Sequence, residues 1–138
     1  MKEYRKLAAI MFTDIVGYTA MMSRDEKSAL RILAKNRELQ KASLHRFHGE
    51  FIKEIGDGIL SIFQSSWDAV CCAIELQRKL TANPSFQLRI GIHIGDIVFS
   101  EKDVFGDGVN IASHIQAICE PGGILMSEKV YDDIKNKI

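Results

Sequence analysis

The chain has 138 residues, 46% of them hydrophobic and 26% charged, which is the composition of one globular domain over residues 1–138. Lys plus Arg and Asp plus Glu each number 18, so the formal net charge is zero; this argues against a nucleic-acid-binding module, which normally carries a basic patch. Three cysteines do not suggest a disulfide framework, and no hydrophobic run is long enough to span a bilayer, so we expect a reduced, cytoplasmic domain without a membrane segment.

The first half of the sequence predicts a strand, two helical segments and a hairpin. Residues 7–14 form a continuous apolar run typical of a buried strand, and a short helical turn is expected over 18–22. Ser23, with a glutamate three residues later, is a capping-box signature that predicts a helix over 23–47. Residues 50–64 place apolar strands on both sides of a Gly-Asp-Gly turn, which is the pattern of a hairpin. One side of the predicted helix carries Ala29, Ile32, Leu33, Asn36, Gln40, Ser43, Leu44 and Phe47.

The second half alternates helices with strands. A helix is expected over 65–82, before an Asn-Pro pair that stops it, and residues 88–94 alternate apolar with polar or small residues as a strand does. Gly95 and Asp96 predict a turn, after which residues 97–100 return as another strand. The remaining expected elements are a loop over 101–108, a helix over 109–119, a strand over 124–126 and a helix over 127–135.

The order of these elements predicts the fold class. Hairpins that alternate with helices favour an α+β fold with a mostly antiparallel sheet and helices on one face, of the ferredoxin-like type. In the helix over 109–119 we expect Ile111, Ile115 and Ile118 to face the core, because they recur at helical spacing.

Two carboxylates stand where strands end. Asp14 closes the first apolar run, and Asp57 sits at the tip of the predicted hairpin. If these strands are neighbours, the two acids converge at one end of the sheet, and converging oxygen ligands suit Mg²⁺ or Mn²⁺ with a polyphosphate. The alternative is that Asp57 is only a turn residue, since Asp-Gly turns are common.

Three segments carry a resemblance to a known family. They cover residues 11–19, 53–58 and 103–113, and the strand around residues 89–93 joins them in order. Together they resemble the catalytic domain of class III nucleotidyl cyclases over nearly the whole chain. That family joins the 3′-hydroxyl of a nucleoside triphosphate to its own α-phosphate and releases pyrophosphate, with two metal ions per site, in intracellular signalling.

The resemblance assigns the metal and phosphate sites. It implies that Asp14 and Asp57 hold two Mg²⁺ or Mn²⁺ ions, helped by the backbone carbonyl of Ile15. It also implies that backbone N–H groups from Ile15 to Thr19 bind the phosphates, and that Gly17 keeps their approach open. The residues of this segment assigned to substrate binding are Phe12, Thr13, Gly17, Tyr18 and Thr19.

The resemblance also assigns the base and the reacting groups. Lys53 and Asp103 match the pair that selects adenine, so ATP is expected rather than GTP, although a solvated lysine and an ordinary loop acid are the alternatives. Asn110 matches the asparagine that orients the ribose. His114 stands where the family has an arginine that stabilises the transition state, and a neutral histidine is a poorer phosphate ligand.

Two features of the family leave two functions open. Its site lies between two chains, so a homodimer is expected to complete it. Family domains also continue into a final strand pair with a phosphate-binding lysine, whereas the printed sequence ends at Ile138, so we expect a fold that lacks this pair. The sequence therefore predicts an adenylyl cyclase domain that makes cyclic AMP from ATP. The alternative is a catalytically weak or silent cyclase-like domain that binds nucleotide or dimerises as a signalling module.

Overall fold

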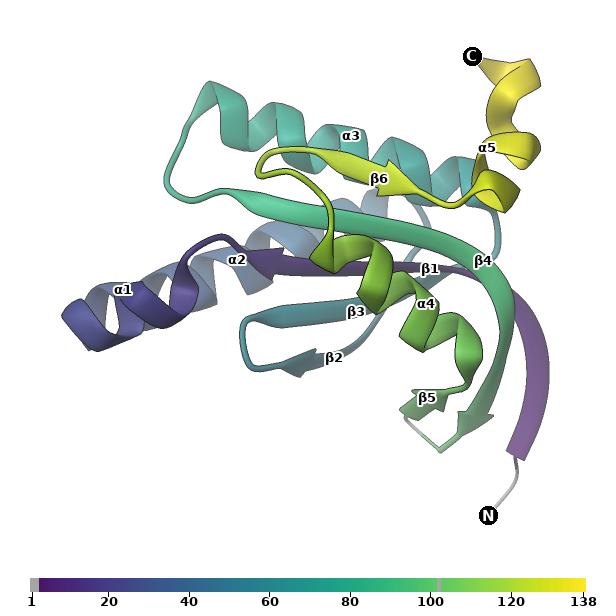
Figure 1. The fold of residues 1–138 in the computed structure, drawn as a ribbon, viewed down its shortest axis with the longest axis horizontal. Coiled ribbons are helices and arrows are strands. Elements are labelled where there is room, and N and C mark those ends of the chain that lie inside the picture. Colours follow the sequence, from purple (N-terminus) through teal and green to yellow (C-terminus); the bar gives the residue numbers. More distant parts are fainter. Residues whose placement is uncertain (1–2, 102) are drawn as a thin grey trace.

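The computed structural model describes residues 3–101 and 103–138. Its elements are β1 (Glu3–Ile15), α1 (Tyr18–Arg24), α2 (Glu26–Arg46), β2 (Glu50–Ile55), β3 (Gly58–Phe63), α3 (Ser66–Ala82), β4 (Leu88–Ser100), β5 (Asp103–Phe105), α4 (Asp107–Ala117), β6 (Ile124–Met126), α5 (Glu128–Ile134) and a final 3₁₀ turn, Lys135–Lys137. The sheet has the strand order β2-β3-β1-β4-β5, with β6 also beside β4 (Figure 1). The described pairings are antiparallel except that of β4 with β6, so the predicted α+β fold with a mostly antiparallel sheet is confirmed.

The predicted hairpin is confirmed as β2 and β3. Ile55 pairs with Gly58, which leaves Gly56 and Asp57 as a two-residue turn. Gly56 has a φ of 61°, a conformation that favours glycine over residues with a side chain. Strand β3 is buried along its whole length and pairs with β1, so the hairpin tip is held beside the end of β1.

Strand β4 runs unbroken through the turn that we predicted at Gly95 and Asp96. It pairs with β1 from Glu3–Ser100 at one end to Ile15–Leu88 at the other. That prediction was wrong because β1 starts at Glu3 rather than at Leu7, and its added residues pair with the second half of β4. The backbone of Asp96 is therefore opposite Leu7 within the sheet, where pairing overrides the turn preference of Gly-Asp.

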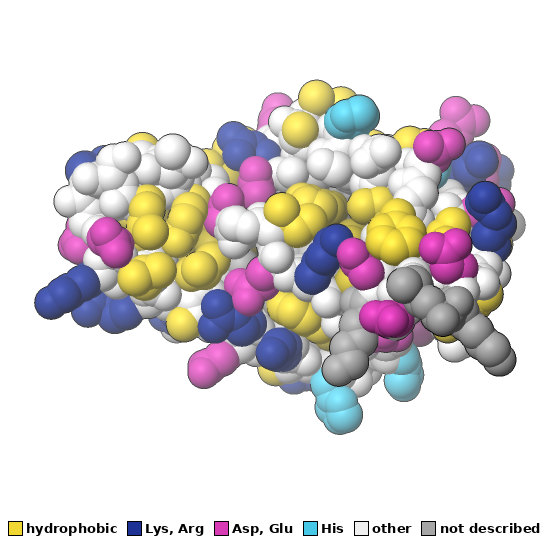
Figure 2. All heavy atoms as spheres, turned by 90° about the horizontal axis from the view of Figure 1, so that it is seen from below, with side chains coloured by type: hydrophobic (Ala, Val, Ile, Leu, Met, Phe, Trp, Pro, Cys, Tyr) yellow, Lys and Arg dark blue, Asp and Glu magenta, His cyan; other side chains and the backbone are white. Residues whose placement is uncertain are grey.

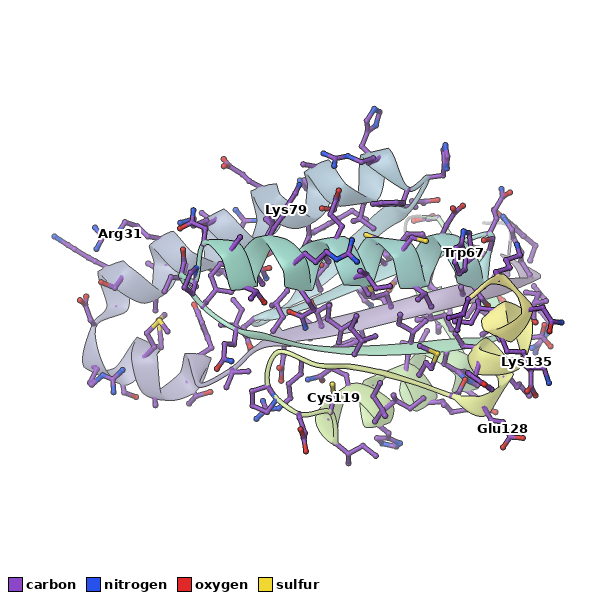
Figure 3. All side chains as sticks on the ribbon, turned by 90° about the horizontal axis from the view of Figure 1, so that it is seen from above. Arg31, Trp67, Lys79, Cys119, Glu128 and Lys135 are labelled. Atoms are coloured by element: carbon purple, nitrogen blue, oxygen red, sulfur yellow. The ribbon has the colours of Figure 1, made fainter. Side chains whose placement is uncertain are left out.

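Helices cover both faces of the sheet, not one as predicted. Helices α2, α3 and α5 enclose a core with one set of strand residues, including Ala9 and Met11 of β1. Helix α4 packs on the opposite face, against a second core that includes Ala8 and Ile10. Seen from above, α2 and α3 lie side by side over the sheet, with Lys79 labelled on α3 (Figure 3). Both faces are possible because β1 is apolar at consecutive positions, which is typical of a strand buried on both sides.

Helix α4 faces the sheet with small residues instead of the predicted isoleucines. Its buried positions are Gly108, Ala112 and Gln116, whereas Ile111 is 40% exposed, Ile118, which follows the helix, is 77% exposed, and Ile115 is half-buried. A Cβ at Gly91 of β4 would lie 2.4 Å from the backbone nitrogen of Gln116, so the helix backbone rests directly on the strand. This close approach requires small side chains at Gly108 and Ala112 and turns Ile111 away from the sheet.

Two local boundaries also differ from the prediction. The side chain of Asp25, not Ser23, caps α2 by accepting a hydrogen bond from the Ser28 N–H at 3.2 Å, and Ser23 belongs to α1. The expected loop before α4 contains the short strand β5, which pairs with the end of β4. In the described part of the chain, no helix is long and apolar enough to cross a membrane.

Candidate functional site

Asp57 and the end of β1 are in direct contact. The backbone N–H of Ile15 donates a hydrogen bond to Oδ2 of Asp57 at 2.9 Å. This contact follows from the sheet, because β1 pairs with β3 and Asp57 is in the turn that leads into β3. The segments that carry the two predicted carboxylates, Asp14 and Asp57, are therefore joined at one end of the sheet, where we expected the two acids to converge.

Asp14 forms an ion pair with Arg89 but leaves one carboxylate oxygen without a hydrogen bond to the described residues. Its Oδ1 atom is buried but makes no hydrogen bond to the described residues, and its nearest cation is Arg89 Nη1 at 3.6 Å. Arg89 is the strand partner of Asp14 across the β1–β4 pairing. A buried carboxylate oxygen without a hydrogen bond is costly unless something else satisfies it. Two adjacent carboxylates with such an oxygen fit Mg²⁺ or Mn²⁺, which prefer oxygen ligands.

The segment after Asp14 turns sharply into α1. Gly17 has a φ of 72° and is the residue that precedes the helix. The Val16 N–H donates a hydrogen bond to the carbonyl of Gln87 at 2.9 Å. No described atom lies within 4 Å of a Cβ built on Gly17, so its backbone conformation, not crowding by the protein, explains the glycine. Tyr18 and Thr19 open the helix next to this turn.

Two predicted substrate residues of β1 are engaged by the protein itself. The side chain of Thr13 is fully buried and accepts a hydrogen bond from Gln40 of α2, which leaves no exposed side-chain atom for a substrate. Phe12 is half-buried against the core under α4, close to Gly58.

Lys53 and Asp103 come together from strands at opposite edges of the sheet. Lys53 Nζ lies 2.7 Å from Asp103 Oδ1, and both side chains are partly exposed, at 37% and 43%. The hydrogen bond from Lys53, followed by that from the Val104 N–H, lowers the pKa of Asp103. The sheet curls so that β2 and β5 approach each other on the side of α4 (Figure 1). The pair that the sequence predicted is thus assembled.

Asn110 and His114 lie one turn apart on α4, and both are exposed. They share the outer side of the helix with Ile111, because the sheet takes Gly108, Ala112 and Gln116. Figure 2 shows the molecule from below, with two groups of hydrophobic side chains, one at the end that carries α1 and one further along, and acidic side chains between them. Such a surface is suited to contact with another protein chain.

A family model described as the adenylate and guanylate cyclase catalytic domain matches residues 1–137. The chain belongs to this family. A protein of Rhizobium meliloti (strain 1021) is 38% identical over 141 residues, which cover 96% of this chain and 24% of that protein. An adenylate cyclase of Glutamicibacter nicotianae is 27% identical over 130 residues, covering 93% of this chain and 32% of that protein. The chain therefore spans about a quarter to a third of the length of these relatives.

Solved structures of the family have the same fold. A crystal structure described as an adenylate/guanylate cyclase/hydrolase from Silicibacter pomeroyi is 36% identical with a TM-score of 0.92, covering 99% of this chain and 84% of that one. The guanylate cyclase domain from Catenaria anguillulae, solved with GTP, is 25% identical with a TM-score of 0.81, covering 99% of this chain and 86% of that one.

Among the described residues, the structure adds Arg89 to the candidate site. The sequence placed it in the strand that joins the motifs, but gave no reason to bring it to Asp14. Only the register of β1 with β4 puts its guanidinium beside that carboxylate. An arginine in this position can bind phosphate with its fork of donors.

Proposed function

We propose that this cyclase domain converts ATP to cyclic AMP and pyrophosphate, with two Mg²⁺ or Mn²⁺ ions at a site completed by a second copy of the chain. The observation that carries the proposal is the convergence of Asp14 and Asp57, whose segments are joined by the Ile15 N–H, while Asp14 keeps a buried oxygen without a hydrogen bond. The relatives named adenylate cyclase support the choice of reaction.

The residues of the chain divide the work between metal, phosphate and ribose. Asp14, Asp57 and the carbonyl of Ile15 are the ligands that would hold the ions. Bound there, the ions supply the positive charge that activates the 3′-hydroxyl and neutralises the phosphates. Arg89 and the backbone N–H groups at Gly17 to Thr19 bind the triphosphate, and Asn110 orients the ribose.

Lys53 and Asp103 select the base in this proposal. The pKa of Asp103 is lowered, so its carboxylate is ionised at neutral pH and only accepts hydrogen bonds, whereas the Lys53 ammonium only donates. Adenine offers a ring nitrogen that accepts and an amino group that donates, which matches this pair. Guanine presents the opposite pattern on the same edge, so we expect ATP to be preferred over GTP.

One observation favours a second function, that of a silent cyclase-like domain. His114 is exposed and stands where the family has an arginine. A histidine offers fewer hydrogen-bond donors to the phosphate, so it stabilises the transition state less well than an arginine does. In that case the chain binds ATP or dimerises in a longer signalling protein without making product.

The deciding experiment measures cyclic AMP from ATP, and cyclic GMP from GTP, with Mn²⁺ and the purified chain. We expect cyclic AMP in the parent chain and a loss in Asp57→Asn that exceeds the roughly 10- to 100-fold cost of changing an outer-sphere group. Asp96→Asn is the matched control, because Asp96 also follows Ile-Gly but lies exposed in β4. ATP binding without product would select the silent domain, and product that survives Asp57→Asn would refute the metal assignment.

A further inference from the structure

Helix α2 and the sheet enclose a cluster of buried polar side chains directly behind Asp14. The five members are fully buried, each with an exposed fraction of 0%: Thr13, Asn36, Gln40, Ser43 and Ser61. Gln40 is the centre of the cluster, since its Nε2 donates to Thr13 Oγ1 and to Asn36 Oδ1, each at 2.9 Å. The cluster therefore connects α2 to the residue that precedes Asp14.

Several atoms of this cluster have no hydrogen-bond partner among the described residues. They are Asn36 Nδ2, Gln40 Oε1, Ser43 Oγ and Ser61 Oγ. Exchanging the nitrogen and oxygen positions in both side-chain amides does not remove the problem. Gln40 would then leave its Nε2 donor unpaired, and Asn36 would leave its Oδ1 acceptor unpaired. Buried unpaired polar atoms destabilise a fold, and hydrophobic side chains of similar size would avoid that cost. Such a local conflict between sequence and stability is expected where a functional site needs support.

The strand geometry shows what the Gln40–Thr13 contact can fix. Successive side chains of a strand point to opposite faces, so Thr13 faces α2 while Asp14 faces the other side of the sheet. Gln40 therefore does not reach Asp14 itself. It holds the backbone from which the Asp14 side chain projects, and the next residue supplies the N–H that binds Asp57.

The second carboxylate is also connected to α2. Arg37, which follows Asn36 in α2, forms an ion pair with Glu54 of β2. Glu54 lies three residues before Asp57, on the arm of the hairpin that leads to the turn. One turn of a single helix thus contacts both segments that carry the carboxylates proposed to bind metal.

We propose that α2 positions the two carboxylates relative to each other, with Gln40 acting on Asp14 through Thr13 and Arg37 acting on Asp57 through Glu54. The inference rests on the proposed function only in taking Asp14 and Asp57 as the metal ligands. Gln40 and Arg37 are positioning residues, because neither contacts the metal or the nucleotide. Their effect is on the geometry of the ligands, and groups that orient metal ligands typically change metal affinity by about 10- to 100-fold.

The first test removes the Thr13 hydroxyl without changing the side-chain shape. In Thr13→Val the Gln40 amide loses its acceptor, and we expect the Mn²⁺ concentration for half-maximal cyclic AMP formation to rise about tenfold, with a smaller change in kcat. Amide hydrogen exchange at Ile15 should accelerate by a similar factor, because its hydrogen bond to Asp57 is less well held. Thr13→Ser, which keeps the hydroxyl, should recover most of both properties. Ser43→Ala is the control, since it removes a polar group from the same cluster without touching Thr13.

The second test compares two arginines of α2 that form ion pairs. Arg37→Met should raise the half-maximal Mn²⁺ concentration, whereas Arg46→Met should leave it unchanged, because Arg46 pairs with Glu75 of α3, away from the hairpin. Both variants lose the same charge, so a difference between them reports position rather than charge.

The outcomes separate this inference from the proposed function. Unchanged metal dependence and unchanged Ile15 exchange in Thr13→Val would overturn the positioning role, as would equal effects of Thr13→Val and Ser43→Ala. If the parent chain makes no cyclic AMP, the proposed function fails by itself. The Ile15 exchange rates, which need neither metal nor substrate, then still decide whether α2 holds the carboxylate segments.

Discussion

At the scale of single residues, we expect His114 to limit the rate of the proposed reaction, because it stands where the family has an arginine. It lies exposed on α4, one turn after Asn110. A neutral imidazole offers one donor, whereas arginine is always charged and offers a fork of donors. Removing one donor to a transition state typically costs on the order of 10²–10³ in rate, and adding one should recover part of that factor.

We therefore expect His114→Arg to raise kcat for cyclic AMP formation by about 10- to 100-fold. The comparison variant is His45→Arg, which makes the same change on an exposed histidine in the last turn of α2. Steady-state assays with Mn²⁺ and ATP measure both variants. Equal rates in the parent and in His114→Arg would mean that position 114 does not face the reacting phosphate.

His93 links β4 to the start of α5 and makes stability depend on pH. It is buried, and its Nδ1 lies 2.8 Å from the Ser127 hydroxyl. Burial first, and the nearby Lys129 second, lower the pKa of His93 below 6.5. The unfolded chain therefore binds a proton at a higher pH than the folded chain does. As pH falls below about 6.5, protonation of the unfolded state reduces the free energy of unfolding, until the folded pKa is reached.

We expect the free energy of unfolding to fall between pH 7.5 and pH 5.5, and to fall less in His93→Gln. Chemical denaturation at the two pH values measures the difference. His48→Gln serves as the reference, because the His48 side chain is 82% exposed. An identical pH dependence in the parent and in His93→Gln would rule out His93 as its source.

At the scale of elements, the contact of α4 with β4 fixes where Asn110 and His114 lie. A Cβ at Gly91 would meet three backbone atoms of α4, Gln116 N at 2.4 Å and both Ala112 O and Gln116 Cα at 2.8 Å. Backbone atoms of a helix cannot move aside one by one, so the whole helix must shift. Gly91 of β4 therefore helps to fix the position of the α4 face that carries Asn110 and His114.

Gly91→Ala should lower the free energy of unfolding by about 1–3 kcal/mol and also reduce cyclic AMP formation, because α4 is displaced. Gly95→Ala, on the same side of β4, should cost less, since its nearest neighbour is the side chain of His93 at 3.2 Å, which can move. Urea denaturation and activity assays report the two effects. A loss in Gly95→Ala as large as that in Gly91→Ala would contradict the explanation.

At the scale of the whole molecule, we expect two copies of the chain to complete the proposed site. The outer side of α4 exposes Ile111 beside Asn110 and His114, and Ile118 is exposed just beyond the helix, so hydrophobic surface surrounds the residues assigned to the reaction. Exposed hydrophobic groups beside functional residues favour an interface with a second copy. Each of the two symmetric sites would then take its carboxylates from one copy and Asn110 from the other.

Mixing two inactive variants tests this arrangement. Asp57→Asn and Asn110→Ala, combined in equal amounts, should restore about a quarter of the parent activity, because half of the dimers are mixed and each has one intact site. Each variant alone sets the baseline. No recovery, under conditions where sedimentation shows mixed dimers, would mean that all site residues act within one copy.

The sequence by itself predicted the carboxylate pair, the hairpin and the order of elements, because each depends on short-range signals. Asp57 is fixed by its two-residue turn, and Asp14 by the end of an apolar run. The family resemblance also implied that Lys53 and Asp103 act as a pair, and the structure places Lys53 Nζ 2.7 Å from Asp103 Oδ1; their role in base selection stays a prediction.

Only the tertiary structure decided which faces are buried and which strands continue. The turn predicted at Gly95–Asp96 is strand, because β1 supplies pairing partners from far away in the sequence. Ile111 of α4 faces outwards, because Gly91 lets the helix backbone rest on the sheet. Arg89 contacts Asp14 because of the register between β1 and β4. Helix α2 contacts the two segments that carry Asp14 and Asp57 because of the way it packs on the sheet. The burial of a surface and the pairing of a strand depend on the element that each of them meets in the folded chain, and the sequence pattern does not identify that element.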